Sequence, residues 1–139
     1  HENVLEIGAG SGYMAALLAH KARHVTTVEI EPELKAMAEK NLADYGISNV
    51  NVELGDGVQG WGDTTYDVVV VSGSVPSVTA GLLANVKVGG RLLAVVGTAP
   101  AMTAQIITRT SDVTYSTVGL FETLLKPLRN APVPSQFKF

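Results

Sequence analysis

Hydrophobic residues along this chain follow two alternating patterns, one typical of strands and one typical of helices. Short apolar and β-branched runs, which are expected of buried strands, occupy residues 4–7, 25–30, 50–54, 67–71 and 92–96. Between these runs, apolar residues recur at helical spacing, which predicts helices over residues 14–22, 32–45 and 78–86. Strands that alternate with helices indicate an α/β fold, in which helices cover both faces of a mostly parallel sheet to give three layers.

Proline and glycine mark the ends of the predicted helices. Pro32 stands where the second helix begins, and Gly46 follows its last apolar residue, an arrangement that suits both helix ends. Pro76 precedes the third helix, which we expect to end at Gly89 and Gly90.

The last part of the chain lacks the helical spacing. Residues 103–109 and 115–125 are rich in Thr, Ile, Val, Tyr and Phe, and a Ser111–Asp112 turn separates them, so we expect an antiparallel hairpin. The hairpin brings the sheet to about seven strands. At this length we expect residues 1–139 to form a single domain. Because His1 stands directly before the first strand, we expect an N-terminal segment to be lacking.

Composition narrows the classes of function. Hydrophobic residues make up 46% of the chain and charged residues 17%, which is typical of a folded protein. A formal net charge of −3 provides no broad basic surface, so we expect no nucleic-acid partner. No apolar run approaches the roughly 20 residues of a membrane span, and we expect a cytoplasmic protein without a membrane partner. The sequence leaves the oligomeric state open.

Two residue types argue against metal and thiol chemistry. The chain has no cysteine, which excludes a disulfide, a thiolate zinc site and a cysteine nucleophile. Its three histidines have no acidic residues at the spacing of metal ligands, so we expect no metal. No side chain in the sequence stands out as a catalytic residue, and the catalytic residues stay unknown at this point.

The strongest chemical signal is the run EIGAGSG at residues 6–12, between the first predicted strand and the first helix. Gly8 and Gly10 let the backbone turn tightly and approach a ligand, and Gly12 lets the helix pack closely on the strand. The spacing G-x-G-x-G differs from the G-x-G-x-x-G of dinucleotide sites. It favours a ligand without a pyrophosphate, such as S-adenosylmethionine, whose sulfonium cation and amino-acid tail suit the acidic Glu6.

Two further acidic residues end the next two predicted strands. Glu29 lies about twenty residues after the glycines, where a carboxylate can accept hydrogen bonds from both ribose hydroxyls. Glu31 is an alternative for this role, but it fits better as the cap of the following helix. Ile30 would then lie against the adenine. Asp56, before Gly57, would accept a hydrogen bond from the adenine amine.

These segments resemble the cofactor segments of protein-L-isoaspartate O-methyltransferases, a family of class I methyltransferases. The resemblance rests on residues 4–13 (VLEIGAGSGY), 28–30 (VEI), 55–61 (GDGVQGW), 66–67 (YD), 88–92 (VGGRL) and 126–128 (KPL). It implies a Rossmann-like methyltransferase fold, S-adenosylmethionine as cofactor, and isoaspartyl residues of damaged proteins or peptides as substrate. The predicted cofactor-binding residues are Glu6, Gly8, Gly10, Ser11, Gly12, Glu29, Ile30, Asp56 and Gly57. Trp61 is expected either beside the cofactor or as an anchor of its loop.

The chain departs from the family pattern at two places. Residues 72–76 read SGSVP, where the family usually carries alanines before a proline, and this segment faces the substrate in the family. The family's substrate loop, with a serine near the reacting carboxylate, precedes the first strand and has no counterpart here, so we expect this chain alone not to methylate an isoaspartyl peptide. Two alternatives therefore stay open: a methyltransferase of RNA or a small metabolite, and a non-catalytic cofactor-binding module.

Overall fold

The computed structural model describes residues 1–123 and 127–128. They form a seven-stranded sheet and three helices. The strands are β1 (Glu2–Ile7), β2 (Ala22–Glu29), β3 (Val50–Leu54), β4 (Tyr66–Val75), β5 (Val86–Thr98), β6 (Ala101–Arg109) and β7 (Tyr115–Glu122). The helices are α1 (Tyr13–Ala19), α2 (Pro32–Asp44) and α3 (Ala80–Ala84). None of these helices has the length and apolar character needed to cross a bilayer.

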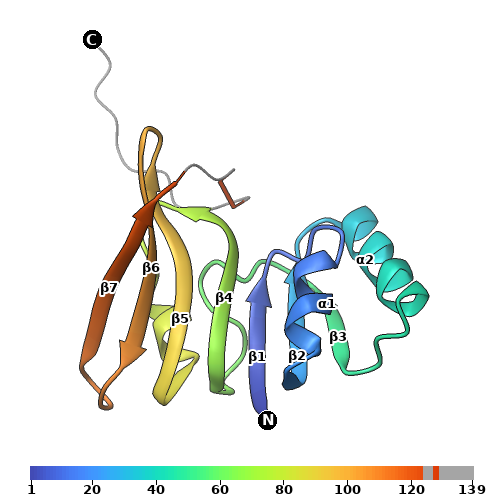
Figure 1. Cartoon of the computed structure of the whole chain (residues 1–139), viewed down its shortest axis with the longest axis horizontal. Helices are drawn as coiled ribbons and strands as arrows, with labels where there is room; N and C mark the ends of the chain where they lie inside the picture. The colour runs from blue at the N-terminus through green and yellow to red at the C-terminus, as the bar shows by residue number, and fades with distance from the viewer. Residues whose placement is uncertain (124–126, 129–139) are drawn as a thin grey trace.

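The strand order in the sheet is β3-β2-β1-β4-β5-β6-β7. The first five of these strands run parallel, while β6 is antiparallel to both β5 and β7. The carboxyl ends of β1 to β4 therefore meet at one edge, the upper edge of the sheet in Figure 1. The α/β class and the C-terminal hairpin predicted from the sequence are both confirmed.

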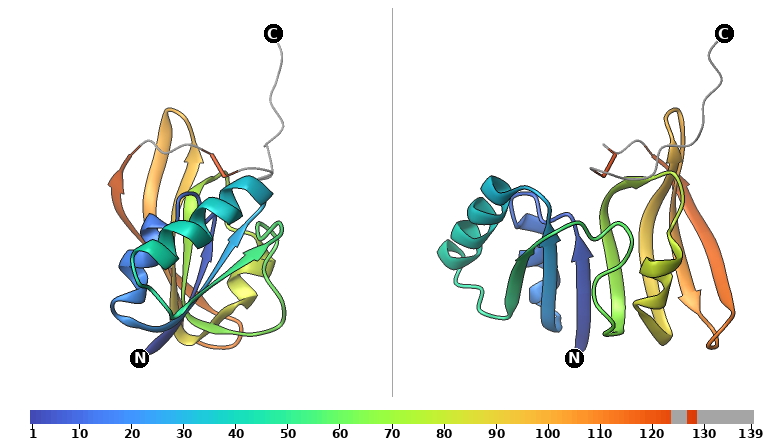
Figure 2. Two further views of the ribbon diagram at one scale, coloured as in Figure 1. Left: turned by 90° about the vertical axis from the view of Figure 1, so that its right-hand side faces the viewer. Right: turned by 180° about the vertical axis from the view of Figure 1, so that it is seen from behind.

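The helices lie on both faces of the sheet, as Figures 1 and 2 show. On one face, Ala15 and Ala16 of α1 and Leu42 of α2 share an apolar cluster with Val4 and Val25. On the other face, Leu82 of α3 packs into a second cluster. That cluster contains Leu5, Ile7, Val28, Val69, Val71, Val75, Val86, Leu92, Ala94 and Ile107. Side chains of β1 contribute to both clusters, because successive strand residues point to opposite faces of the sheet.

The structure corrects the predicted bounds of two helices. The first helix ends at Ala19 rather than Ala22, because β2 begins at Ala22, which pairs with Glu2. The third helix is limited to α3, and the expectation that it ends at Gly89 and Gly90 was wrong. Both glycines lie within β5, where the register with β4 shifts.

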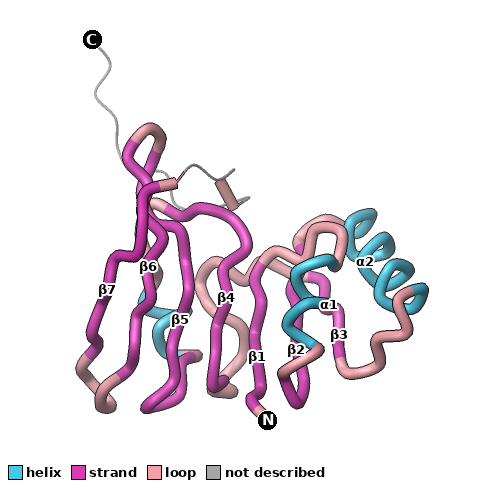
Figure 3. Tube along the Cα trace, in the orientation of Figure 1, coloured by secondary structure: helices cyan, strands magenta, loops and turns pink. Residues whose placement is uncertain are grey.

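A close approach of two strands explains Gly90, whereas Gly89 has a φ of +85°, a conformation that favours glycine. A Cβ added to Gly90 would lie 2.7 Å from the main-chain oxygen of Asp67, so a side chain there would clash with β4. Glycines inside a strand commonly mark such a bulge. Residues 55–65, which connect β3 to β4, form a loop without a helix (Figure 3).

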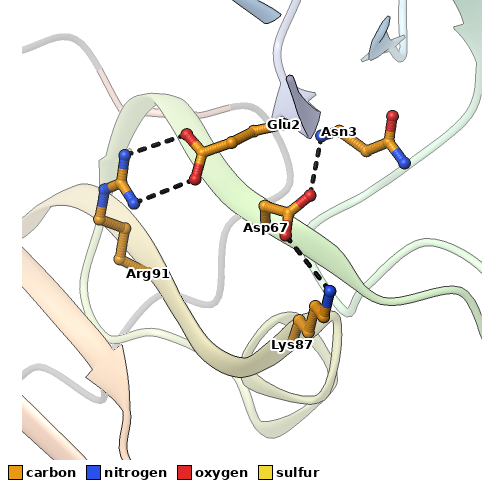
Figure 4. Close-up of polar contacts among 5 residues, drawn as sticks. All are labelled: Glu2, Asn3, Asp67, Lys87 and Arg91. Atoms are coloured by element: carbon orange, nitrogen blue, oxygen red, sulfur yellow. Dashed lines mark hydrogen bonds and ion pairs between the residues drawn. The ribbon is translucent and has the colours of Figure 1, made fainter. Parts of the chain in front are cut away.

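Polar contacts join β1, β4 and β5 near the amino ends of β1 and β4 (Figure 4). Arg91 Nη2 lies 3.2 Å from Glu2 Oε1, and Lys87 Nζ lies 3.6 Å from Asp67 Oδ1. The Asn3 N–H donates to Asp67 Oδ2 at 2.9 Å. This hydrogen bond, with a smaller effect of Lys87, lowers the pKa of Asp67 below its ordinary value. The contacts fix the start of β1 against its neighbour.

Candidate cofactor-binding site

A cavity of about 220 Å³ lies at the carboxyl ends of β1, β2, β3 and β4. In open parallel sheets this edge is the usual place for ligands. Its wall consists of Ile7, Gly8, Gly10, Val28, Glu29, Ile30, Leu34, Gly55, Asp56, Gly57, Val58, Ser72, Pro127 and Leu128. Ligand cavities commonly measure roughly 300–1,000 Å³, so a ligand of that size would extend beyond this wall.

The glycine run forms the turn between β1 and α1. The Gly8 N–H donates to the Val28 carbonyl at 2.8 Å, which ties the turn to β2. Gly8 has a φ of +95°, a conformation that side chains disfavour. A Cβ on Gly8 would lie 3.0 Å from Leu128 Cδ1 and 3.3 Å from the Ser72 carbonyl oxygen. Glycine here therefore keeps the cavity open where three distant segments meet.

Gly12 has a different role from the one expected of it. A Cβ on Gly12 would lie 3.3 Å from the Cα of Ala38, so this glycine allows α2, rather than the strand, to approach closely. Gly12 and Ser11 lie outside the wall of the cavity. The Ser11 carbonyl accepts a hydrogen bond from the Asn41 side chain at 2.9 Å, which further ties the turn to α2.

Glu29 is 5% exposed and is held in place by two main-chain donors. Its Oε1 accepts from the Gly10 N–H at 2.9 Å, and its Oε2 accepts from the Glu31 N–H at 3.0 Å. Each carboxylate oxygen has more than one lone pair, so Glu29 retains acceptor capacity toward the cavity that it lines. Glu31 occupies the N-cap position of α2, as predicted, although its side chain makes no cap hydrogen bond.

The third strand contributes the other end of the cavity. Asp56 Oδ1 accepts from the Val58 N–H at 3.1 Å, which stabilises a tight turn after β3. A Cβ on Gly57 would lie 2.5 Å from Ile7 Cδ1, so glycine allows this turn to lie against β1. Ile30 and Val58 add apolar surface. This end of the cavity therefore combines a carboxylate with apolar side chains.

Glu6 lies beneath the glycine turn rather than in the cavity wall. Its side chain is fully buried, and it accepts hydrogen bonds from Thr27 Oγ1 at 2.7 Å and Ser72 Oγ at 2.5 Å. Burial raises the pKa of Glu6 to about 7, although both hydroxyl hydrogen bonds and the nearby charge of Glu29 also act on it. Glu6 reaches the cavity only through Ser72.

The loop between β3 and β4 is held by a residue that the sequence did not single out. The buried Asn85 accepts from the Trp61 N–H at 2.8 Å, and its amide donates to the carbonyls of Trp61, Gly62 and Thr64. Trp61 packs on the apolar cluster and lies outside the cavity wall, so the structure favours its interpretation as a loop anchor.

Six of the nine predicted residues therefore line one cavity: Gly8, Gly10, Glu29, Ile30, Asp56 and Gly57. Glu6, Ser11 and Gly12 support the turn behind it. The sequence did not identify Leu34, Val58 and Leu128 as wall residues. Each of them lies close in sequence to a predicted motif: Leu34 follows Pro32, Val58 follows Gly57, and Leu128 ends the KPL run. This proximity is the signal that could have identified them. Lys126 and Leu125 lie outside the described residues.

The wall suits one class of ligand. Its polar groups are carboxylates, hydroxyls and main-chain atoms, and its remaining surface is apolar, a combination that matches a ring system carrying hydroxyl or amino donors. Two carboxylates at the edge disfavour a phosphate. No group of three or more His, Asp or Glu side chains that could hold a metal ion occurs in residues 1–123 and 127–128.

Comparison with known proteins identifies close similarity to one family. Residues 1–130 match the family model described as protein-L-isoaspartate(D-aspartate) O-methyltransferase. The chain is 48% identical over 97 residues to the protein-L-isoaspartate O-methyltransferase of Rhodopseudomonas palustris, covering 69% of this chain and 44% of that protein. It is 41% identical over 129 residues to protein-L-isoaspartate O-methyltransferase 2 of Marinobacter nauticus, covering 91% of this chain and 59% of that protein.

Solved structures give the same result for the fold. A protein-L-isoaspartate O-methyltransferase superposes with a TM-score of 0.82 at 28% identity, over 91% of this chain and 41% of that one. A Plasmodium falciparum structure described as a beta-aspartate methyltransferase, in complex with S-adenosyl-L-homocysteine, superposes with a TM-score of 0.79 at 16% identity, over 92% and 66%. The chain spans about half the length of the curated relatives that it matches.

Proposed function

Because the chain belongs to the protein-L-isoaspartate(D-aspartate) O-methyltransferase family, we propose that its cavity binds S-adenosylmethionine for methylation of isoaspartyl carboxylates in proteins. The observation that carries the proposal is the position of Glu29. This carboxylate lines the cavity between the glycine turn and Ile30, and two main-chain N–H groups hold it there. A fixed carboxylate at the end of β2 is the group that binds ribose hydroxyls in related sheet folds.

The fit of the remaining residues supports the same ligand. Asp56 and Gly57 would face the adenine beside Ile30, and Gly8 and Gly10 would admit the sulfur and the amino-acid tail. An added Cβ would lie 3.0 Å from Leu128 Cδ1 at Gly8 and 2.5 Å from Ile7 Cδ1 at Gly57, whereas at Gly10 it would meet nothing within 4 Å. Ser11 and Gly12 would act from behind, by fixing the turn against α2, and Glu6 would act through Ser72.

Methyl transfer to a carboxylate requires little of the side chains beyond binding and aligning the reactants. When bound, S-adenosylmethionine supplies a methyl group on a positively charged sulfur. A carboxylate acceptor is ionised at neutral pH, since ordinary carboxyl pKa values lie near 4, so it needs no general base. The wall residues therefore contribute by holding the adenosine rigidly and excluding water, which provides a proximity advantage of several kcal/mol. Pro127 and Leu128 supply the apolar cover on the β4 side.

Calorimetric titration of the protein tests the ligand assignment. We expect S-adenosylmethionine and S-adenosylhomocysteine to bind, and NAD not to displace them at comparable concentration, because the turn lacks the dinucleotide spacing. Glu33→Ala, which removes an exposed acid from the first turn of α2, is the control for loss of a negative charge outside the cavity. Its affinity for both ligands should equal that of the wild type. Failure of both adenosyl ligands to bind would contradict the proposal.

The acceptor class needs its own measurement. With this chain inside a protein of the length of its curated relatives, we expect labelled methyl from S-adenosylmethionine to be transferred to an isoaspartyl peptide and not to the same peptide with ordinary aspartate, whereas this chain alone should transfer none. Transfer to RNA or to a small metabolite, with the peptide left unlabelled, would assign the cavity to a different methyltransferase. Binding without transfer to any acceptor would favour a non-catalytic module.

A further inference from the structure

The hydroxyl of Ser72 connects the cavity to a buried carboxyl group. Ser72 lines the cavity, and its Oγ donates to Glu6 Oε2 at 2.5 Å. Glu6 itself is fully buried, and its other oxygen is occupied by Thr27. Because the Ser72 proton points toward Glu6 when Glu6 is ionised, the lone pairs of Oγ are left for the cavity. Ser72 Oγ, with the negative charge of Glu6 on its far side, therefore favours a positively charged group in the cavity.

The charges around Glu6 leave it without a positive partner in the part of the chain that the structure describes. The nearby charge acting on it is that of Glu29, from β2, which also raises its pKa. From β4 it meets Ser72, and α1 carries Tyr13 as its single ionisable residue, 62% exposed. The lysines of α2 are paired with acids of the same helix, Lys35 with Glu39 and Lys40 with Asp44.

A buried carboxylate without a positive partner is costly, and a cation that enters its neighbourhood offsets part of that cost. The order of the strands indicates where such a cation would lie. In the sheet order, β3, which precedes Asp56 in the chain, and β2, which ends at Glu29, come before β1, which precedes Gly8, and Ser72 follows on β4. A ligand whose adenosine lies over β3 and β2 places its sulfur next in line, over Gly8, beside Ser72.

We propose that Ser72, supported by Glu6, recognises the positive charge of the sulfonium and thereby makes the cavity prefer the methyl donor over its demethylated product. The proposal rests on the proposed function, since it assumes that the cavity binds S-adenosylmethionine. Ser72 is the contact residue, and Glu6 is a positioning residue that acts through it.

The preference follows from what methyl transfer does to charge. The acceptor oxygen forms a bond to the methyl carbon, the carbon–sulfur bond breaks with its electron pair remaining on sulfur, and the sulfur becomes a neutral thioether. The negative Ser72–Glu6 pair therefore loses its partner when the product forms. Discrimination should depend on pH, because a protonated Glu6 offers no charge and an ionised one does.

Calorimetric affinities for S-adenosylmethionine and S-adenosylhomocysteine at pH 5.5, 7 and 8.5 test the proposal. If the sulfonium lowers the pKa of Glu6 by about one unit, the ratio of the two affinities rises about five- to tenfold across this range. Glu6→Gln should flatten the ratio, Ser72→Ala should reduce it at pH 8.5, and Ser72→Thr should restore it. Ser74→Ala is the matched control, because Ser74 lies on the same strand outside the cavity wall and should preserve the wild-type ratio.

The outcomes separate this proposal from the proposed function. If neither adenosyl ligand binds, the proposed function fails and the inference fails with it. If both ligands bind and their affinity ratio stays constant with pH, or Ser72→Ala leaves the ratio unchanged, the inference is overturned while the proposed function stands. Should Glu6→Gln fail to fold, the three Ser72 and Ser74 variants still decide between these results.

Discussion

The buried carboxyl of Glu6 makes the stability of the folded protein depend on pH. Burial raises its pKa from the ordinary 4.5 to about 7, against the opposing effect of the hydrogen bonds from Ser72 and Thr27. The folded chain thus binds the Glu6 proton more tightly than the unfolded chain does. Stability should therefore fall as the pH rises from about 4.5 to about 7 and level off above that range.

Replacing Glu6 by glutamine removes this loss, because the amide stays neutral at every pH. Since one pKa unit corresponds to about 1.4 kcal/mol, the stability of Glu6→Gln relative to the wild type should rise by about 2–3 kcal/mol between pH 5 and pH 8. At pH 5 the two proteins should be similar, because the wild-type side chain is then protonated in the folded state.

Urea denaturation at several pH values measures this difference directly, since the linear extrapolation gives the free energy of unfolding in water. Glu122→Gln is the control, because Glu122 is an exposed carboxylate at the end of β7, and its stability difference should change little with pH. Parallel stability profiles for Glu6→Gln and the wild type between pH 5 and pH 8 would contradict this expectation. They would mean that the folded protein tolerates the Glu6 charge without cost.

Three other substitutions test separate parts of the structure. Glu29→Ala should weaken S-adenosylhomocysteine binding about ten- to a hundredfold in calorimetry, the effect of a lost charged hydrogen bond; unchanged affinity would contradict its placement. Asn85→Ala should lower the free energy of unfolding by about 2–3 kcal/mol in urea, because main-chain groups of the loop after Gly60 lose their partners; a loss well below 1 kcal/mol would contradict this. Asp67→Asn should destabilise the protein at pH 7, and the deficit should narrow as the pH falls below about 4, because the pKa of Asp67 is lowered mainly by the Asn3 N–H and its stabilising effect is lost on protonation. A stability deficit of Asp67→Asn that stays constant with pH would contradict this prediction.

The sequence predicted the fold class because its strongest features are local. Runs of valine and isoleucine predicted the parallel strands, and the glycines of residues 8–12 marked the turn at which β1 meets α1. Gly89 and Gly90 were misinterpreted for a physical reason: glycine pairs suit both a helix end and a strand bulge. Only the approach of β5 to the main chain of Asp67 decides between them, and that contact is not visible in a sequence.

The site shows the same division between local and long-range information. The positions of Glu29 and Asp56 at the sheet edge could be predicted, since Glu29 is the last residue of β2 and Asp56 lies two residues after the end of β3. The role of Glu6 could not, because its environment depends on Thr27 and Ser72 from two neighbouring strands. The covering position of Leu128 depends on the path of the whole chain over the sheet edge, which residue spacing does not encode.

The contact between Gly8 and Leu128 has a consequence for how the protein folds. Leu128 is held by its N–H donating to the Ser74 carbonyl at 2.8 Å, and Pro127 forms a bridge with Ser74. Bringing these residues to the glycine turn closes a loop that spans nearly the whole chain, and the entropy of closing such a loop is lost before the contact is gained. Contacts of this kind slow folding. The helices and the central strands should therefore form early during refolding. The ability to bind a ligand should appear last, when Pro127 and Leu128 reach the glycine turn.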